Sequence, residues 1–106
     1  MVKTEKDLQN YTKKEARKHG VGYYKLTCVG QTGFPDVLLT WHGWCIFIEL
    51  KSPAGTGRVP PRQTHVLAQL SYQDIETYVI SQPEQIDALI AGLIHREPRP
   101  MHHAFI

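Results

Sequence analysis

The chain has 106 residues, 42% of them hydrophobic, which predicts one domain with a modest core. Its formal net charge of +2 is compatible with a nucleic-acid partner without indicating one. No apolar run reaches the length of a membrane span and the N-terminus lacks the apolar core of a secretion signal, so we expect a cytoplasmic protein with no membrane partner.

The chain opens with a predicted helix from about residue 4. Thr4 with Asp7 three residues later resembles a capping box, and His19-Gly20 supplies the usual C-terminal stop. Glu5 lies on the inward side of this helix. The second half carries a basic cluster, which is as well explained by a solvated face as by a binding surface. The cluster comprises Lys13, Lys14, Arg17 and Lys18.

Three strands follow, and the last two should form a hairpin. Residues 23–29 are rich in aromatic and β-branched types. His42-Gly43 separates residues 37–41 from residues 44–48, and a two-residue turn that ends in glycine is typical of a hairpin. Both hairpin strands carry apolar residues on both faces, which indicates the middle of a covered sheet.

The turn fixes which residues of the hairpin lie opposite each other. With His42-Gly43 as the turn, Asp36 opposes Glu49. Cross-strand partners point to the same face, and Lys51, two residues beyond Glu49, returns to that face. Like charges directly opposite each other are unfavourable. We therefore expect a positive ligand between them, and a divalent cation is the natural candidate because hard cations take carboxylate and carbonyl oxygens.

A Gly/Pro-rich loop and a second helix come after the hairpin. Residues 52–61 hold three prolines and two glycines. Pro60-Pro61 suits the first turn of a helix, and Gln63 falls at the start of its buried stripe.

The last elements are a strand, a helix and a tail. Residues 76–80 form the fourth predicted strand, and Ser81 with Glu84 resembles a second capping box that opens the last helix. The tail, residues 95–106, has no periodicity. We expect it to be extended, or ordered at an interface with a partner chain.

The residues that the hairpin brings together suit phosphodiester hydrolysis. This reaction needs an activated water and charge compensation at phosphorus, which carboxylate-held metal ions and a nearby lysine supply. Asp36 and Glu49 would hold the metal, and the carbonyl of Leu50 would be a third ligand. Lys51 would orient or activate the nucleophile. Gln63 would hydrogen-bond Lys51, water or a phosphate.

Three short motifs resemble a known nuclease superfamily. Gly33-Phe34-Pro35-Asp36, then Glu49-Leu50-Lys51, then Gln63 resemble the PD-(D/E)xK nucleases. The Gly-x-Pro-Asp sequence, the glutamine and the αβββαβ order are most similar to the virus-type replication-repair nuclease (VRR-NUC) domain. The resemblance implies an α/β fold with an α+β mixed sheet, built as a restriction-endonuclease-like αβββαβ core with an added C-terminal helix. It implies a VRR-NUC-like domain over residues 1–94, followed by the tail at 95–106.

The resemblance also implies roles for individual residues. It assigns the metal-binding acids, the catalytic lysine and the family glutamine to Asp36, Glu49, Lys51 and Gln63. The N-terminal family glutamate maps best onto Glu5, with Glu15 as the alternative. The implied cofactor is Mg²⁺ or Mn²⁺, with no organic cofactor, and one or two ions remain equally open. Gln73-Asp74 stands where the family often has glycine before the fourth strand.

Together these features predict a metal-dependent endodeoxyribonuclease acting on branched DNA such as Holliday junctions. Short stand-alone members of the family are similar to dimeric Holliday-junction resolvases and are typical of phages, which implies a homodimer. A flap, nicking, restriction-type or RNA-cutting nuclease of the same chemistry stays open, as does a catalytically silent binding module. Phosphate contacts are expected from Lys13, Lys14, Arg17, Lys18, Arg58 and Arg62.

Other candidate sites are weaker. His102-His103 has no carboxylate or cysteine partner within the aperiodic tail. Trp41 and Trp44 flank the turn, where a cross-strand aromatic pair is a better explanation than stacking on bases. Cys28 and Cys45 show no C-x-x-C spacing, and we expect two buried thiols.

Overall fold

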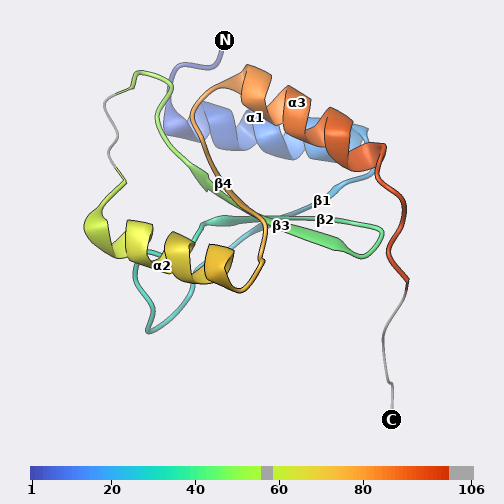
Figure 1. The fold of residues 1–106 in the computed structure, drawn as a ribbon. Helices are drawn as coiled ribbons and strands as arrows, with labels where there is room; N and C mark the ends of the chain where they lie inside the picture. The colour runs from blue at the N-terminus through green and yellow to red at the C-terminus, as the bar shows by residue number, and fades with distance from the viewer. Residues whose placement is uncertain (56–58, 101–106) are drawn as a thin grey trace.

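A computed structural model describes residues 1–55 and 59–100. The helices of the described chain are α1 (Glu5–Lys18), α2 (Pro61–Tyr72) and α3 (Pro83–Ile94). The strands are β1 (Gly22–Lys25), β2 (Val37–Trp41), β3 (Trp44–Leu50) and β4 (Thr77–Ile80). They form one mixed sheet in the order β1-β2-β3-β4, with α1 and α3 on one face and α2 on the other (Figure 1). This confirms the predicted α+β mixed sheet and restriction-endonuclease-like core with an added C-terminal helix.

The hairpin has the predicted turn and register. His42 and Gly43 both have positive φ, 38° and 90°, as a two-residue turn that matches strand twist requires. Trp41 pairs with Trp44, and the antiparallel pairing runs outward to Val37 and Ile48. Asp36, just before β2, and Glu49, in β3, come next in this register.

β1 is shorter than the predicted strand at residues 23–29. Its pairing with β2 ends where Lys25 meets Val37, because β2 begins at that residue. One further backbone bond follows, from Leu26 N to Asp36 O at 2.8 Å. Without a partner strand beyond this point, the chain continues as a loop.

The hydrophobic core lies between the sheet and the α1–α3 layer. Alternation along β2 and β3 sends every second side chain to this face. α1 contributes Leu8 and Ala16, and its Thr4–Asp7 capping box is present as predicted. The buried cluster comprises Leu8, Ala16, Val21, Val37, Leu39, Ile46, Ile48, Leu50, Ile80, Ile86, Ile90 and Leu93.

β4 runs parallel to β3 and follows the crossover helix α2. Asp74 joins α2 to β4 with φ 60°, a left-handed conformation that suits glycine and that aspartate tolerates better than most residues. Asp74 therefore adopts the left-handed conformation at the position where the family resemblance led us to expect glycine.

The N-terminal cap of α3 differs from the prediction. Gln82, not Ser81, is the cap, and its partner is Gln85 rather than Glu84. Pro83 occupies the first turn, where its missing N–H and fixed φ are no disadvantage. The helix therefore begins one residue later than the Ser81–Glu84 pattern indicates.

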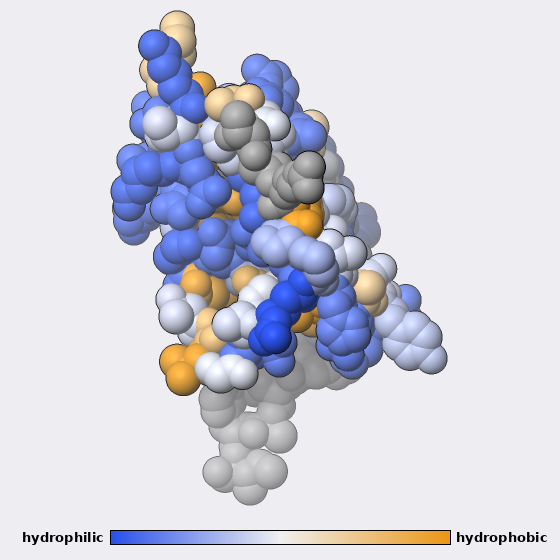
Figure 2. Space-filling model, turned by 90° about the vertical axis from the view of Figure 1, so that its left-hand side faces the viewer, coloured by the Kyte–Doolittle hydropathy of each residue, from blue (hydrophilic) through white to orange (hydrophobic). Residues whose placement is uncertain are grey.

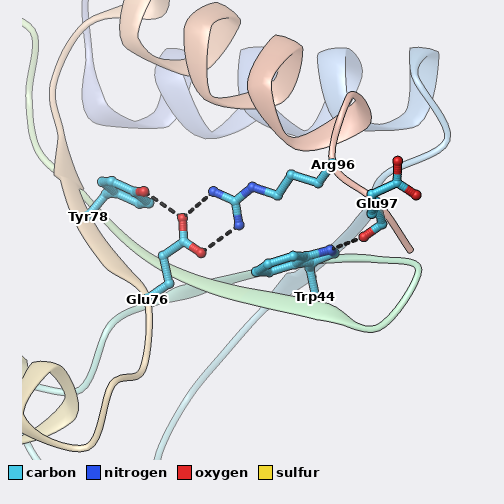
Figure 3. A network of polar contacts seen from close by, with 5 residues as sticks. All are labelled: Trp44, Glu76, Tyr78, Arg96 and Glu97. Atoms are coloured by element: carbon cyan, nitrogen blue, oxygen red, sulfur yellow. Dashed lines mark hydrogen bonds and ion pairs between the residues drawn. The ribbon is translucent and has the colours of Figure 1, made fainter. Parts of the chain in front are cut away.

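The start of the predicted tail is tied to the hairpin and to β4 by a polar network (Figure 3). Arg96 donates two hydrogen bonds to the Glu76 carboxylate, at 2.7 and 2.6 Å, and Tyr78 donates a third. Trp44 Nε1 donates to the carbonyl of Glu97 at 2.9 Å, and the Arg96 guanidinium lies over the Trp44 ring. These contacts fasten the segment after α3 to the chain's own sheet.

Arg99 continues this attachment to the hairpin turn. Its N–H donates to His42 O at 2.9 Å, and its guanidinium stacks on Trp44 at 3.7 Å from the ring centroid. A Cβ at Gly43 would lie 2.6 Å from Arg99 Cβ, so the turn glycine also makes room for this segment. Residues 101–106, with His102-His103, lie outside the described residues.

Both cysteines are exposed free thiols, contrary to the expected burial. Cys45 lies beside the core residue Ile46, so alternation turns it to the opposite face of the sheet, near the hairpin turn. Cys28 lies in the loop that replaces the end of the predicted first strand. No helix in the described part of the chain has the length and apolar character needed to cross a membrane.

We expect Glu76→Gln to lower the free energy of unfolding by about 1–2 kcal/mol at pH 7, because it removes a bidentate ion pair with Arg96. That contact holds the pKa of Glu76 below its ordinary value of 4.5. Wild type therefore keeps this stabilisation above pH 4.5 and loses it as the pH falls below that value. Urea unfolding across this range should show the gap between the two proteins closing in acid.

Glu97→Gln is the matched control, because it removes the same charge while Glu97 serves the network through its backbone carbonyl. It should unfold like wild type. A gap between Glu76→Gln and wild type that stays constant down to about pH 3 would contradict the assignment.

Candidate functional site

The candidate site lies where β2 and β3 part. Leu50 N donates a long hydrogen bond, 3.4 Å, to Asp36 Oδ1 rather than to the backbone of β2. The next residue bonds to the other side, from Lys51 N to Ile80 O at 2.9 Å. Since the N–H and C=O of one strand residue point the same way, the Leu50 carbonyl faces the gap beside Asp36.

Glu49 is a nearly buried carboxylate next to this gap. It is 7% exposed, and its Oε2 lies 3.2 Å from Lys51 Nζ. Burial raises its pKa, and the Asp36 charge adds to that shift, whereas Gln63 and Lys51 act in the opposite direction. The two carboxylates are therefore close enough to repel each other, as the register predicts.

Gln63 reaches the same place from the other layer. It is the third residue of α2 and 6% exposed, on the sheet face that Glu49 occupies. Among the described residues, neither Gln63 Oε1 nor Glu49 Oε1 has a hydrogen-bond partner. Buried oxygens without donors are unfavourable unless a ligand satisfies them.

Gly33 sets the position of α2 against the site. Its φ is 87°, and a Cβ there would lie 3.0 Å from Gln63 N and Cα. The hydroxyl of Thr32 accepts a hydrogen bond from Arg62 Nη1 at 2.8 Å. The loop before Asp36 thus packs directly against the first turn of the helix that carries Gln63.

The oxygens present here fit a hard divalent cation. Asp36 and Glu49 supply carboxylates, and the Leu50 carbonyl faces the same gap. Over residues 1–55 and 59–100, no group of three or more His, Cys, Asp or Glu side chains could hold a metal. A cation here would thus depend on two carboxylates, a carbonyl, water and substrate oxygens, an arrangement typical of Mg²⁺.

The structure does not bring the α1 glutamates to this pair. Glu5 is exposed in the first turn of the helix. Glu15 lies 3.9 Å from Lys18, on the side of α1 that faces α3. Glu5 and Glu15 as metal ligands therefore stay predictions from the family resemblance.

The basic residues divide between the two ends of the molecule. Arg62 is exposed on α2 next to Gln63. The α1 cluster of Lys13, Lys14, Arg17 and Lys18 is also exposed. It occupies the half of α1 away from the end where β3 runs into the loop before α2 (Figure 1). Figure 2 views that latter end, where hydrophilic residues predominate around small hydrophobic patches. Arg58 lies outside the described residues.

One site residue escaped the sequence analysis. Lys25 Nζ lies 2.9 Å from Asp36 Oδ2. Lys25 ends β1, and the signal that would have found it is the pairing of β1 with β2, which brings Lys25 to Val37 beside Asp36.

These features define a class of fold and site: a small α+β domain with two carboxylates at the divergence of its central strands and a lysine two residues after the second. The sequence matches no protein-family model and no curated protein. The structure is similar to a solved chain described as "VRR_NUC domain", with a TM-score of 0.75 and 26% sequence identity. The match covers 85% of this chain and 97% of the other, and it confirms the resemblance to a VRR-NUC nuclease domain.

We expect Glu49→Gln to raise the stability of the metal-free protein at neutral pH by on the order of 1 kcal/mol, because an amide is easier to bury than a carboxylate. The pKa of Glu49 is raised in the folded state, so wild type gains stability as the pH falls through that pKa and approaches the variant. Thermal unfolding in EDTA should show a midpoint several degrees higher for Glu49→Gln at pH 7.5.

Glu84→Gln, at an exposed position in the first turn of α3, is the control for loss of one negative charge. It should not raise the midpoint. A lower midpoint for Glu49→Gln at every pH would show that the carboxylate is favourable where it lies.

We expect Gly33→Ala to destabilise the protein by more than Gly30→Ala does. Both glycines have left-handed backbones, φ 87° and 81°, and alanine at such a position costs about 1–2 kcal/mol. A Cβ at Gly30 meets no atom within 4 Å, whereas a Cβ at Gly33 meets the α2 backbone at 3.0 Å. Urea unfolding of both variants isolates the contact with α2. Equal decreases in the free energy of unfolding would show that this contact adds no cost.

Proposed function

We propose that the chain is a divalent-metal-dependent nuclease that hydrolyses phosphodiester bonds in structured or branched DNA, such as Holliday junctions. The observation that carries the proposal is the meeting of Asp36, Glu49 and Lys51 where β2 and β3 part, in a fold similar to a VRR_NUC domain. Two repelling carboxylates beside a lysine are poorly explained by stability, because Glu49 is unfavourable as a buried anion.

Mg²⁺ or Mn²⁺ is the proposed cofactor. The carboxylates of Asp36 and Glu49 and the carbonyl of Leu50 would hold it. When bound, such an ion compensates charge at phosphorus and increases the acidity of water. Glu5, or Glu15 in its place, remains the proposed additional carboxylate.

Lys51 and Gln63 would position the attacking water and the phosphate. The Lys51 ammonium, 3.2 Å from Glu49, donates hydrogen bonds and would hold a water or a phosphate oxygen at the edge of the pair. Gln63 offers a buried acceptor, Oε1, that lacks a donor among the described residues. A hydrogen bond from water or from Lys51 would satisfy it and fix the direction of attack.

The DNA backbone would be held by basic residues on two surfaces. Arg62 lies at the start of α2 beside Gln63, and Arg58 precedes it in sequence. The α1 cluster would contact a second, more distant stretch of backbone. Ionic contacts to phosphate position a duplex without reading its bases, which favours recognition by shape.

A homodimer would supply a second active site for cutting two strands symmetrically. β4 is the last strand of the described sheet, where Tyr78 and Val79 are exposed, and Ile75 is exposed just before the strand begins. An uncovered edge strand with apolar side chains readily pairs with another chain. The edge of β4 is therefore the proposed dimer surface. The mass in solution would show whether the chain is a dimer.

Two alternative functions are compatible with the same site residues. Flap, nicking, restriction-type or RNA-directed cleavage would use the same residues on a different substrate. A binding module without turnover would retain the fold. It would not explain the raised pKa of Glu49 or the buried Glu49 and Gln63 oxygens that lack hydrogen-bond partners among the described residues. A panel of four-way junction, flap, nicked duplex, single-stranded DNA and RNA would separate these functions.

We expect wild type to cleave a four-way junction in Mg²⁺ or Mn²⁺ and not in EDTA. Lys51→Ala should slow single-turnover cleavage by about 10²–10⁴-fold, because a group that positions or activates the nucleophile contributes about that much. Junction binding should change little, since one phosphate contact is a small part of the total.

Lys6→Ala is the control, an exposed α1 lysine outside both the carboxylate pair and the basic cluster, and it should cleave at the wild-type rate. Binding of junction by wild type without cleavage of any substrate, in either metal, would favour the binding module. Cleavage that survives Lys51→Ala undiminished would remove Lys51 from the proposed chemistry.

A further inference from the structure

We propose that Lys25 is a positioning residue with two partners: it neutralises Asp36 while no cation is bound, and it turns to a DNA phosphate once a cation takes that carboxylate. Both halves rest on the proposed function: the first on its cation site at Asp36, and the second also on its DNA substrate. The first half concerns the binding of a divalent cation alone, and is tested without DNA.

Lys25 pairs with the Asp36 oxygen that the Leu50 N–H leaves free. Asp36 Oδ1 accepts the backbone N–H of Leu50, whereas Oδ2 lies 2.9 Å from Lys25 Nζ. An oxygen that pairs with an ammonium is a poorer ligand, because the ion must first displace the positive charge. Lys25 and a divalent ion therefore compete for the same atom.

The ion pair is of a kind that exchanges readily. The Lys25 side chain is 47% exposed, and pairs open to solvent are weak. Lys25 is the last residue of β1, and its four-carbon side chain can rotate away without disturbing a strand. Asp36, at 18% exposed, is the more enclosed partner. The lysine is thus the partner that moves.

The second lysine of the site differs in ways that suit a different task. Lys51 is 17% exposed, and its backbone N–H is bonded to Ile80 O. Its partner, Glu49, is the more deeply buried acid. Lys51 is thus held beside the buried Glu49, whereas Lys25 lies at the more exposed side of Asp36.

A phosphate is the partner that a displaced Lys25 would find. A divalent ion would cancel the charges of Asp36 and Glu49, so Asp36 would no longer attract Lys25, and Lys51 beside the pair would leave the site net positive. Substrate oxygens would complete the shell of such an ion, which would bring a DNA phosphate close to Asp36 and Lys25. The geometry points to Lys25 as a contact for that phosphate or its neighbour on the same strand.

The first test is calorimetric titration of DNA-free protein with Mn²⁺. Lys25→Met removes the ammonium but keeps a long aliphatic side chain, and should bind Mn²⁺ about two- to fivefold more tightly than wild type. Lys25→Arg should bind it more weakly than wild type, because a guanidinium can pair with a carboxylate through two bonds. Lys6→Met controls for the loss of one surface charge.

The second test measures affinity for a four-way junction with Ca²⁺ in the site and with EDTA. Lys25→Met should weaken binding about three- to tenfold in Ca²⁺ and leave it nearly unchanged in EDTA, and Lys25→Arg should restore the Ca²⁺ value. A purely structural lysine would not produce opposite effects on metal and DNA affinity.

Unchanged or weaker Mn²⁺ binding by Lys25→Met, with wild-type thermal stability, would overturn the proposal. If Lys25→Met does not fold, equal or tighter Mn²⁺ binding by Lys25→Arg overturns it instead. Tighter Mn²⁺ binding by Lys25→Met, together with a wild type that cleaves no nucleic acid, would support the competition at Asp36 while refuting the nuclease function. The two failures are therefore distinguishable.

Discussion

The burial of the Glu49 carboxylate next to Asp36 is the constraint that the rest of the structure has to accommodate. A like-charged pair is unfavourable anywhere, and Glu49 adds the free-energy cost of burial. The fold sustains it because the apolar residues of β2 and β3 face the α1–α3 layer and supply stability from the opposite side of the sheet. Lys25 and Lys51 then offset part of the charge, one at each carboxylate. The site is thus a locally unfavourable arrangement, and the stability supplied by the separate hydrophobic core offsets it.

The same division explains the two layers of helix. α1 and α3 bury the core, and Tyr11 of α1 is bonded to Asp87 of α3. α2 buries little besides Gln63 and Val66. It serves to deliver Gln63 to the carboxylates and to carry the chain into the parallel strand β4. Gly33 lets the loop before Asp36 contact the first turn of α2. The segment that leads into Asp36 therefore also packs against the helix that carries Gln63.

Features fixed by local chemistry could be predicted from the sequence, and features fixed by distant pairing could not. The Thr4 cap, the His42-Gly43 turn and the hairpin register follow from neighbouring residues. β1 ends early because its length depends on its register with β2, which no local pattern encodes. Lys25 was missed for the same reason, since it meets Asp36 across the sheet. The α3 cap was misjudged because Pro83 outweighs the Ser81–Glu84 pattern.

The hairpin has a consequence for the order in which the molecule folds. Asp36 and Glu49 are joined by a tight turn, whereas Gln63 and β4 reach them only after the long crossover through α2. Local contacts form before distant ones, because closing a larger loop loses more chain entropy. The two acids therefore meet in a half-built sheet, while α2 is still unplaced and the repulsion is screened by water alone. If the proposed cation site exists, the turn alone brings its two carboxylates together, before α2 adds Gln63 to them.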